Sequence, residues 1–226
     1  MTTATRARPV FDWMIALGIA SVLAALLRIF AFTPYEAVQG PAQKIFYVHV
    51  PAAMSAYIAL TVAALMSILY LWLKDERADR LAESAGEVAL VFTSAVLISG
   101  PFWGKPVWGV WWTWDARLTL TLFLWFIAAA YAVLRGAIED PGMRARYSAV
   151  LAVLAALLIP FIHLSVYLFR TAHPMPIVLK PERPSLPAEM LTTFIVANLA
   201  FLFFCVTLIR ARYRLAVQRA QATEPF

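Results

Sequence analysis

The sequence predicts an all-α integral membrane protein, a six-transmembrane-helix bundle, and two observations support that prediction. Of the 226 residues, 62% are hydrophobic and only 14% are charged, whereas soluble domains are about 45–50% apolar and about 25% charged. A helix needs about 20 apolar residues to cross the bilayer core. Six apolar stretches approach or exceed this length, at 11–32, 45–73, 85–101, 119–134, 148–168 and 188–209. They take up most of the chain, so we expect a single membrane domain over residues 1–226.

The first apolar stretch follows "MTTATRARPV", a basic start that is superficially like a secretory signal peptide. A signal peptide that is removed has an apolar core of only about 7–15 residues, followed by a small-residue cleavage site. In this sequence the apolar residues continue to Phe32. We therefore expect a first transmembrane helix that is retained.

The distribution of lysine and arginine predicts that the N- and C-termini are both cytoplasmic. With that orientation, the cytoplasmic segments carry Arg6, Arg8, Lys74, Arg77, Arg80, Arg135, Arg144, Arg146, Arg210, Arg212, Arg214 and Arg219. The outer side carries Arg28, Lys44, Lys105, Arg117, Arg170, Lys180 and Arg183. The excess of cytoplasmic basic residues agrees with the positive-inside rule. The net charge of +6 is thus first a topology signal, and no nucleic-acid motif accompanies it.

The segment 102–118, between the third and fourth predicted helices, is expected to be a loop on the outer face. It contains five of the eight tryptophans of the chain, namely Trp103, Trp108, Trp111, Trp112 and Trp114. Tryptophans often form a belt at the membrane interface, but a belt spreads over many helix ends, a role open to Trp13, Trp72 and Trp125. The clustering in one segment favours a surface whose indole faces lie against a ligand. Because Trp111 and Trp112 are adjacent, at most one of them is expected to lie flat on it.

Two of the three histidines flank this tryptophan-rich segment on the same side of the membrane. His49, in "FYVHVPAA", is near the outer end of the second helix, and His173, in "FRTAHPMP", is in the outer loop before the sixth. The third, His163, follows Pro160 within the fifth helix. A proline frees a helical carbonyl, so a hydrogen bond to that carbonyl would explain His163. An ionisable group inside the membrane is also a functional candidate.

A ligand for this surface should be flat and apolar, should accept two imidazoles, and should pair its anionic groups with Lys105, Arg117 or Arg170. Haem meets each condition, because histidine is a common axial ligand of haem iron and haem carries two propionates. We therefore expect haem between His49 and His173 at the outer surface.

Asp115 and Arg117 close the segment, and each has an alternative role. Asp115 precedes the fourth helix, where an aspartate caps the free backbone N–H groups. Because Asp115 is an anion, it is not expected to bind the propionates. Arg117 either pairs with a propionate or extends its charged end to the lipid headgroups.

The run "WGKPVWGVWWTWDARLT", from Trp103 to Thr119, resembles the tryptophan-rich WWD signature of haem-handling membrane proteins. Within that group the chain is similar to the CcmC family of haem exporter subunits in cytochrome c maturation. The six-helix size, "KIFYVHVPAA" before the second helix and the histidine loop before the sixth fit this family. The resemblance implies that His49 and His173 are the axial ligands of the haem iron. It places Trp103, Trp108, Trp112, Trp114, Asp115 and Arg117 in the haem-binding signature.

The resemblance also implies partners and a location. Haem b would be held as a transported ligand and passed to a periplasmic haem chaperone that is CcmE-like. ATP-binding, permease and small single-helix subunits, which are CcmA-, CcmB- and CcmD-like, would complete an ABC-type export complex in the bacterial inner membrane. The chain would then be a binding and transfer subunit and not an enzyme, although a part in covalent attachment of haem to the chaperone stays open.

Other chemistries find little support in the residues. Cys205 is the one cysteine, so there is no C-x-x-C pair for thiol exchange or covalent haem attachment. The sequence has no glycine-rich phosphate loop, so the chain itself is not expected to use ATP. Two alternative functions stay open: a redox subunit that cycles haem iron with quinone, and a permease or assembly subunit for another apolar ligand.

Overall fold

The computed structural model describes residues 12–169, 171–178 and 180–223. Within these residues six helices are long and apolar enough to cross a membrane. The structure confirms the predicted all-α, six-helix fold class. The helices are α1 (Trp13–Leu27), α2 (Phe46–Leu73), α3 (Glu76–Trp108), α4 (Ala116–Ala137), α5 (Pro141–Leu168) and α6 (Ala188–Thr223). A π-helical turn η1 (Arg28–Phe32) extends α1, and a 3-10 helix η2 (Pro41–Ile45) leads into α2.

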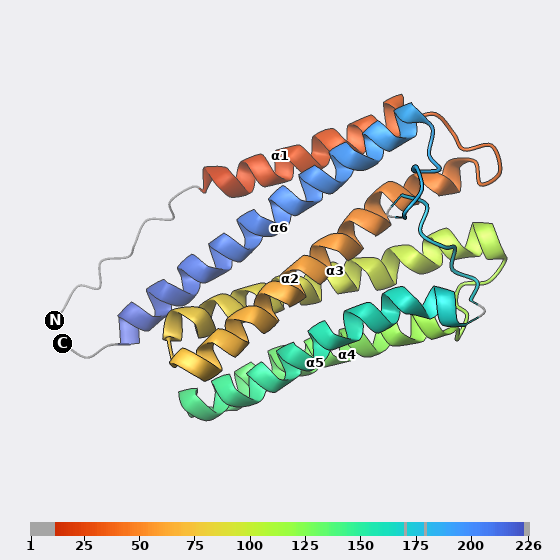
Figure 1. Ribbon diagram of the computed structural model, residues 1–226. Helices are drawn as coiled ribbons and strands as arrows, with labels where there is room; N and C mark the ends of the chain where they lie inside the picture. Colours follow the sequence, from red (N-terminus) through yellow and green to blue (C-terminus); the bar gives the residue numbers. More distant parts are fainter. Residues whose placement is uncertain (1–11, 170, 179, 224–226) are drawn as a thin grey trace.

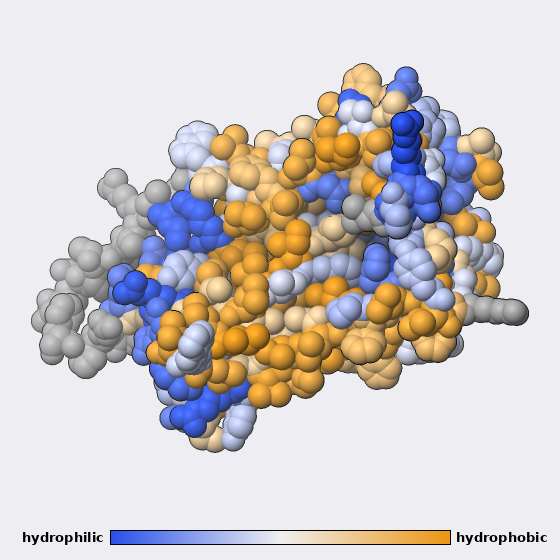
Figure 2. Space-filling view, viewed as in Figure 1, coloured by the Kyte–Doolittle hydropathy of each residue, from blue (hydrophilic) through white to orange (hydrophobic). Residues whose placement is uncertain are grey.

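The helices are arranged around a central hairpin formed by α2 and α3 (Figure 1). On one side of this hairpin α6 packs against α2 and α3 and carries α1, and on the other side α4 and α5 pack together. The core of the hairpin consists largely of alanines that are at most 1% exposed, namely Ala52, Ala56, Ala59, Ala85 and Ala89. Small side chains let membrane helices approach closely. Apolar side chains cover the middle of the molecule and polar ones gather toward its ends (Figure 2).

Aspartate caps fix the start of four helices in the described part of the chain. Asp12, Asp75, Asp115 and Asp140 each accept a backbone N–H from the first turn of α1, α3, α4 and α5. Capping satisfies N–H groups that have no partner within the helix. The caps explain why α3 starts at Glu76 and α5 at Pro141, ahead of the predicted 85 and 148. Hydropathy marks only the apolar part of a helix, and these polar first turns lie outside it.

The predicted outer loop 102–118 is shorter in the structure, because α3 continues through Pro101 and Pro106 to Trp108. The helix ends at Gly109, whose φ of 79° favours glycine. The N–H of Gly109 donates to the carbonyl of Lys105 at 3.0 Å. Residues 109–115 form the connection, and α4 begins at Ala116. Trp103 and Trp108 are therefore helical, and only the later tryptophans lie in a loop.

Helix α6 also exceeds its predicted end at 209, since it continues to Thr223. Arginines on this extension bind carboxylates of other helices: Arg210 pairs with Asp12 at 3.0 Å, and Arg212 pairs with Glu87. These ion pairs join the end of α6 to the start of α1 and to α3, and they explain why the helix outlasts its apolar run.

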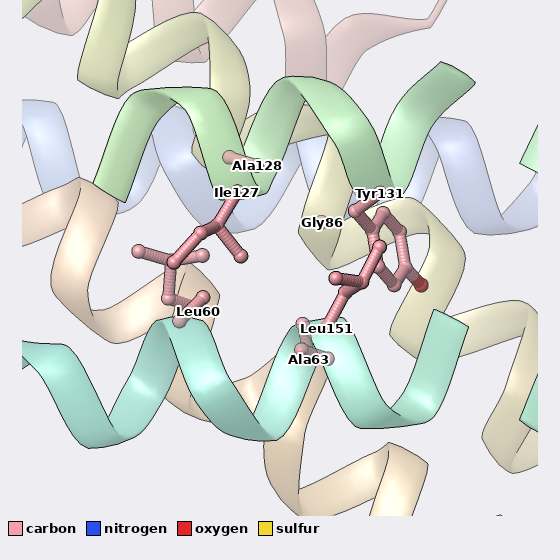
Figure 3. A pocket seen from close by; sticks show the side chains of 9 residues that line it. Leu60, Ala63, Gly86, Ile127, Ala128, Tyr131 and Leu151 are labelled. Carbon is pink, nitrogen blue, oxygen red and sulfur yellow. The ribbon is translucent and has the colours of Figure 1, made fainter. Parts of the chain in front are cut away.

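A second polar cluster joins α3 to α4 at the end of the bundle away from residues 109–115. Arg135 is 8% exposed, and its guanidinium donates to Asp79 at 2.8 Å and to Glu83 at 3.1 Å. One turn before it, Tyr131 lies beside Gly86, where an added Cβ would come within 2.5 Å of the ring (Figure 3). The neighbouring void is only about 10 Å³, which is at most enough for one water molecule. This part of the bundle is thus closely packed and offers no ligand site.

Candidate functional site

A cavity of about 650 Å³ lies where α2, α5 and α6 meet the connections between helices. Its size is typical of a site for a small molecule or cofactor, about 300–1,000 Å³. All three histidines of the chain line it, together with Arg117 and Trp103. Its other walls include residues 35–37 and Gln39, the α2 residues Val50, Ala53, Met54 and Tyr57, and Met190 and Phe194 of α6.

Each functional side chain reaches the cavity from a different element. His49 is in the first turn of α2, Arg117 is the second residue of α4, and His163 is in the last turns of α5. His173 lies on the connection between α5 and α6, which crosses this end of the bundle (Figure 1). Residues far apart in the sequence thus meet because α2 lies between α5 and α6.

A chain of hydrogen bonds orients the His49 imidazole. Its Nδ1 is 2.9 Å from the hydroxyl of Ser99 on α3, and that hydroxyl donates to the carbonyl of Ala95 at 2.7 Å. Since the Ser99 proton is engaged with Ala95, the hydroxyl oxygen accepts the Nδ1–H of His49. The Nε2 atom then keeps its lone pair. A hydrogen bond at one ring nitrogen is the usual way in which proteins fix a histidine for metal binding at the other.

The His173 imidazole is oriented in the same way by its own connection. Its Nδ1 is 3.0 Å from the carbonyl oxygen of Pro174, which can only accept, so Nδ1 carries the proton and Nε2 is free. Burial and the nearby Arg117 guanidinium lower the pKa of His173 to about 4, although the hydrogen bond to Pro174 opposes this shift. The ring is therefore neutral at pH 7, the form that binds metal ions.

Arg117 supplies a positive charge without a partner carboxylate. None of the described Asp or Glu side chains lies within 4.0 Å of its guanidinium. Its neighbour Asp115 is engaged elsewhere: its carboxylate accepts from the N–H of Leu118 and the hydroxyl of Thr113, both at 3.0 Å. It also accepts from the N–H of Ala172 at 3.3 Å. Asp115 therefore caps α4, as predicted, and ties the connection of His173 to the start of α4.

The tryptophans of the signature divide into two groups. Trp103 lines the cavity, its ring is 5.7 Å from that of His49, and its Nε1–H donates to Gln39 at 2.9 Å. Trp108 lies beside His173, with ring centroids 6.4 Å apart. These two indoles are the ones that the structure brings to the histidines.

The other tryptophans lie on residues 109–115, outside the cavity lining. Trp112 and Trp114 contact each other edge to face at 5.8 Å. The Nε1 of Trp112 is buried without a hydrogen-bond partner, while Trp114 is 76% exposed. Trp111 is 54% exposed and meets Phe102 edge to face. Trp111 and Trp114 are exposed, and together with the half-buried Trp112 they form the aromatic patch on the connection between α3 and α4.

Lys105, another predicted cation, is not part of the cavity lining. The Nζ of Lys105 donates to the carbonyl of Gly109 at 2.8 Å and closes the end of α3. Arg170 lies outside the described residues. Of the three predicted partners for an anionic ligand, Arg117 is the one that the structure places on the cavity.

Sequence reasoning missed several residues of the site, above all Ser99 and Gln39. Ser99 is a polar residue in the apolar run "VLISGPFWG", four positions before Trp103 and thus on the same face of α3. That spacing could have indicated that Ser99 lies on the side of α3 that faces the site. Gln39 lies in the connection before α2, and nothing in the sequence relates it to Trp103.

The sequence profile of the CcmC family, described as Heme exporter protein C, matches residues 2–225. The chain belongs to the CcmC family. It is 32% identical over 199 residues to a Heme exporter protein C of Haemophilus influenzae, with 87% of this chain and 80% of the relative covered. It is 30% identical over 227 residues to a Heme exporter protein C of Rhodobacter capsulatus, with 99% and 93% covered. The resemblance of the signature is thereby confirmed at the level of the family.

The contacts of Asp115 predict separable effects of two substitutions. Asp115→Ala should cost about 1 kcal/mol through loss of the cap, and it should speed hydrogen exchange at the amides of Leu118 and Ala172. Asp115→Asn has one acceptor oxygen, so it should restore protection at Leu118 but not at Ala172. Hydrogen–deuterium exchange of the purified protein measures both amides.

The matched control is Asp140→Ala, which removes the cap of α5, where the carboxylate accepts from the N–H of Met143. It should cost similar stability and leave Ala172 unchanged. Equal exchange at Ala172 in the parent and in Asp115→Ala would show that Asp115 does not hold the connection of His173.

Proposed function

We propose that the chain binds haem in this cavity at the periplasmic face of the bacterial inner membrane and presents it to a haem chaperone during cytochrome c maturation. The Nε2 atoms of His49 and His173 would be the two axial ligands of the iron. The observation that carries the proposal is that both histidines line one apolar cavity with Nδ1 engaged and Nε2 free.

The remaining lining suits the rest of a haem molecule. The porphyrin is large and apolar, and the cavity walls offer Trp103, Phe46, Met190 and Phe194 to it. The propionates are anionic, and Arg117 on the cavity wall has no carboxylate partner among the described residues. A charge-assisted hydrogen bond in such surroundings is about twice as strong as a neutral one. Haem b bound as a transported ligand would therefore suit the two imidazoles, the apolar walls and Arg117.

Two histidine ligands also favour holding haem over reacting with it. Bound haem would supply an iron centre with both axial positions filled, which leaves none for oxygen chemistry. The role that fits is retention and transfer, so we propose a carrier subunit and not an enzyme. The aromatic patch, in which Trp111 and Trp114 are exposed, is a suitable surface for the periplasmic chaperone, because aromatic side chains that become buried dominate many protein interfaces.

The same proposal includes the orientation of the chain in the membrane and the export complex to which it belongs. Cytoplasmic termini and a signature facing the periplasm follow from the distribution of basic residues. The relatives carry the name Heme exporter protein C, which supports a complex with CcmA-, CcmB- and CcmD-like subunits and a CcmE-like chaperone. The chain lacks a phosphate-binding loop of its own, so ATP binding would belong to a partner subunit.

Absorption spectra of the protein purified with a haem supply test the proposed ligands. The parent protein should show a low-spin Soret band, which His49→Ala should lose and His173→Ala should weaken, because each removes one axial nitrogen. Ser94→Ala on α3 is the control, since the Ser94 hydroxyl binds Trp125 away from the cavity. Failure of the parent to take up haem would overturn the proposal and favour a protein-contact role for the tryptophans.

Charge reversal tests the role of Arg117. Arg117→Glu should weaken haem retention about 10-fold or more, since hydrogen bonds to charged groups contribute about 1.5–3 kcal/mol. Arg80→Glu is the comparison, because Arg80 pairs with Glu76 on α3 and does not line the cavity. Haem dissociation to an apo-haem-binding protein gives both rates. Equal acceleration in the two variants would exclude a propionate contact by Arg117.

A further inference from the structure

The third histidine of the cavity has no structural role among the described contacts. His163 lies five residues before the end of α5 at Leu168, about 7.5 Å along the helix axis. It makes no hydrogen bond to another described residue, and its one described ring neighbour is Tyr167, at 6.3 Å. The carbonyl that Pro160 leaves without its helical partner is that of Ala156, four residues earlier, and no described hydrogen bond joins His163 to it. The expected hydrogen bond of His163 to a freed carbonyl is therefore not observed.

The position of His163 connects the cavity with the membrane. His163 lines the cavity, while its neighbours on α5, Phe161, Leu164 and Tyr167, are between 47% and 60% exposed on the apolar surface. Both α5 and α6 pack against α2, but the two form no extensive contact with each other. Figure 1 shows α2 running between them. The wall that carries His163 is thus the wall nearest the lipid.

We propose that His163 is a third iron ligand of this cavity, which holds haem as it arrives from the membrane and then yields it to His173. This inference rests on the proposed function. An ionisable group within a membrane helix is costly and is usually kept for a function, and His163 faces a cavity with two other histidines. His163 is on a helix near lipid, and His173 is on a connection near the aromatic patch 111–114. The two ligands are thus suited to intake and to delivery.

The exchange is balanced without a further reactant. One iron–nitrogen bond to His163 breaks and one to the Nε2 of His173 forms, while His49 remains bound. One imidazole replaces another, so no electron or leaving group is required. Arg117 lines the same cavity as all three histidines, so it can keep a propionate in place during the exchange.

Spectra of single and double variants test the third ligand. His173→Ala should retain a substantial low-spin, six-coordinate fraction, because His163 replaces the missing ligand. His163→Gln/His173→Ala should be five-coordinate and high-spin, and added imidazole should restore the low-spin band. Identical spectra of His173→Ala and the double variant would overturn the inference while leaving haem binding by the parent intact. A parent protein without haem would overturn both proposals.

The intake role predicts a kinetic effect of His163 alone. His163→Gln keeps a polar side chain of similar size, and its final spectrum should equal that of the parent, through His49 and His173. Its rate of haem uptake from haem-loaded phosphatidylcholine vesicles should fall about 5-fold or more. Leu164→Ala, which changes an exposed neighbour outside the cavity, should take up haem at the parental rate. Equal uptake rates of His163→Gln and the parent would contradict the intake role.

Discussion

The close packing of α2 against α3 is the constraint on which the rest of the structure depends. Alanines at the contact let the two backbones approach, and this approach brings Ser99 of α3 to His49 of α2. The same hairpin separates α1 and α6 from α4 and α5 (Figure 1). The cavity exists because α5 and α6 both pack on α2 and leave a space over its first turns. A wider hairpin would lose the orientation of His49 and the shape of the cavity together.

Three groups at that cavity have no described partner in the protein: the Nε2 atoms of His49 and His173 and the guanidinium of Arg117. The Nε2 atoms of His49 and His173 are free because Nδ1 of each ring is engaged. Arg117 has no carboxylate partner in the described part of the chain, because Asp115 is engaged by the start of α4 and by the connection of His173. Unused ligating atoms and an unpaired charge beside apolar walls are costly without a ligand. Bound haem would give the two nitrogens an iron atom and Arg117 a propionate. The contacts at the cavity and the family membership thus support the same proposal.

The sequence was sufficient for the fold class because membrane helices must be long and apolar, whatever they pack against. It also predicted that His49, His173, Trp103 and Arg117 lie close together, and the structure places all four on one cavity because the helix order brings them to one end. It placed the ends of α3 wrongly, since the helix continues through Pro101 and Pro106 and Asp75 caps a polar first turn. Two tryptophans lie beside the histidines and three lie on residues 109–115. This division depends on where α3 ends, at Gly109, and so could not be predicted from the spacing of the tryptophans.

The central claim is that the iron lies between two imidazole nitrogens of this cavity. Pulsed electron paramagnetic resonance of the ferric, haem-loaded protein, prepared with ¹⁵N-labelled histidine, counts the axial histidine nitrogens directly. We expect two strongly coupled histidine nitrogens in the parent protein and one after His49→Ala. A single histidine nitrogen in the parent, or none, would contradict it.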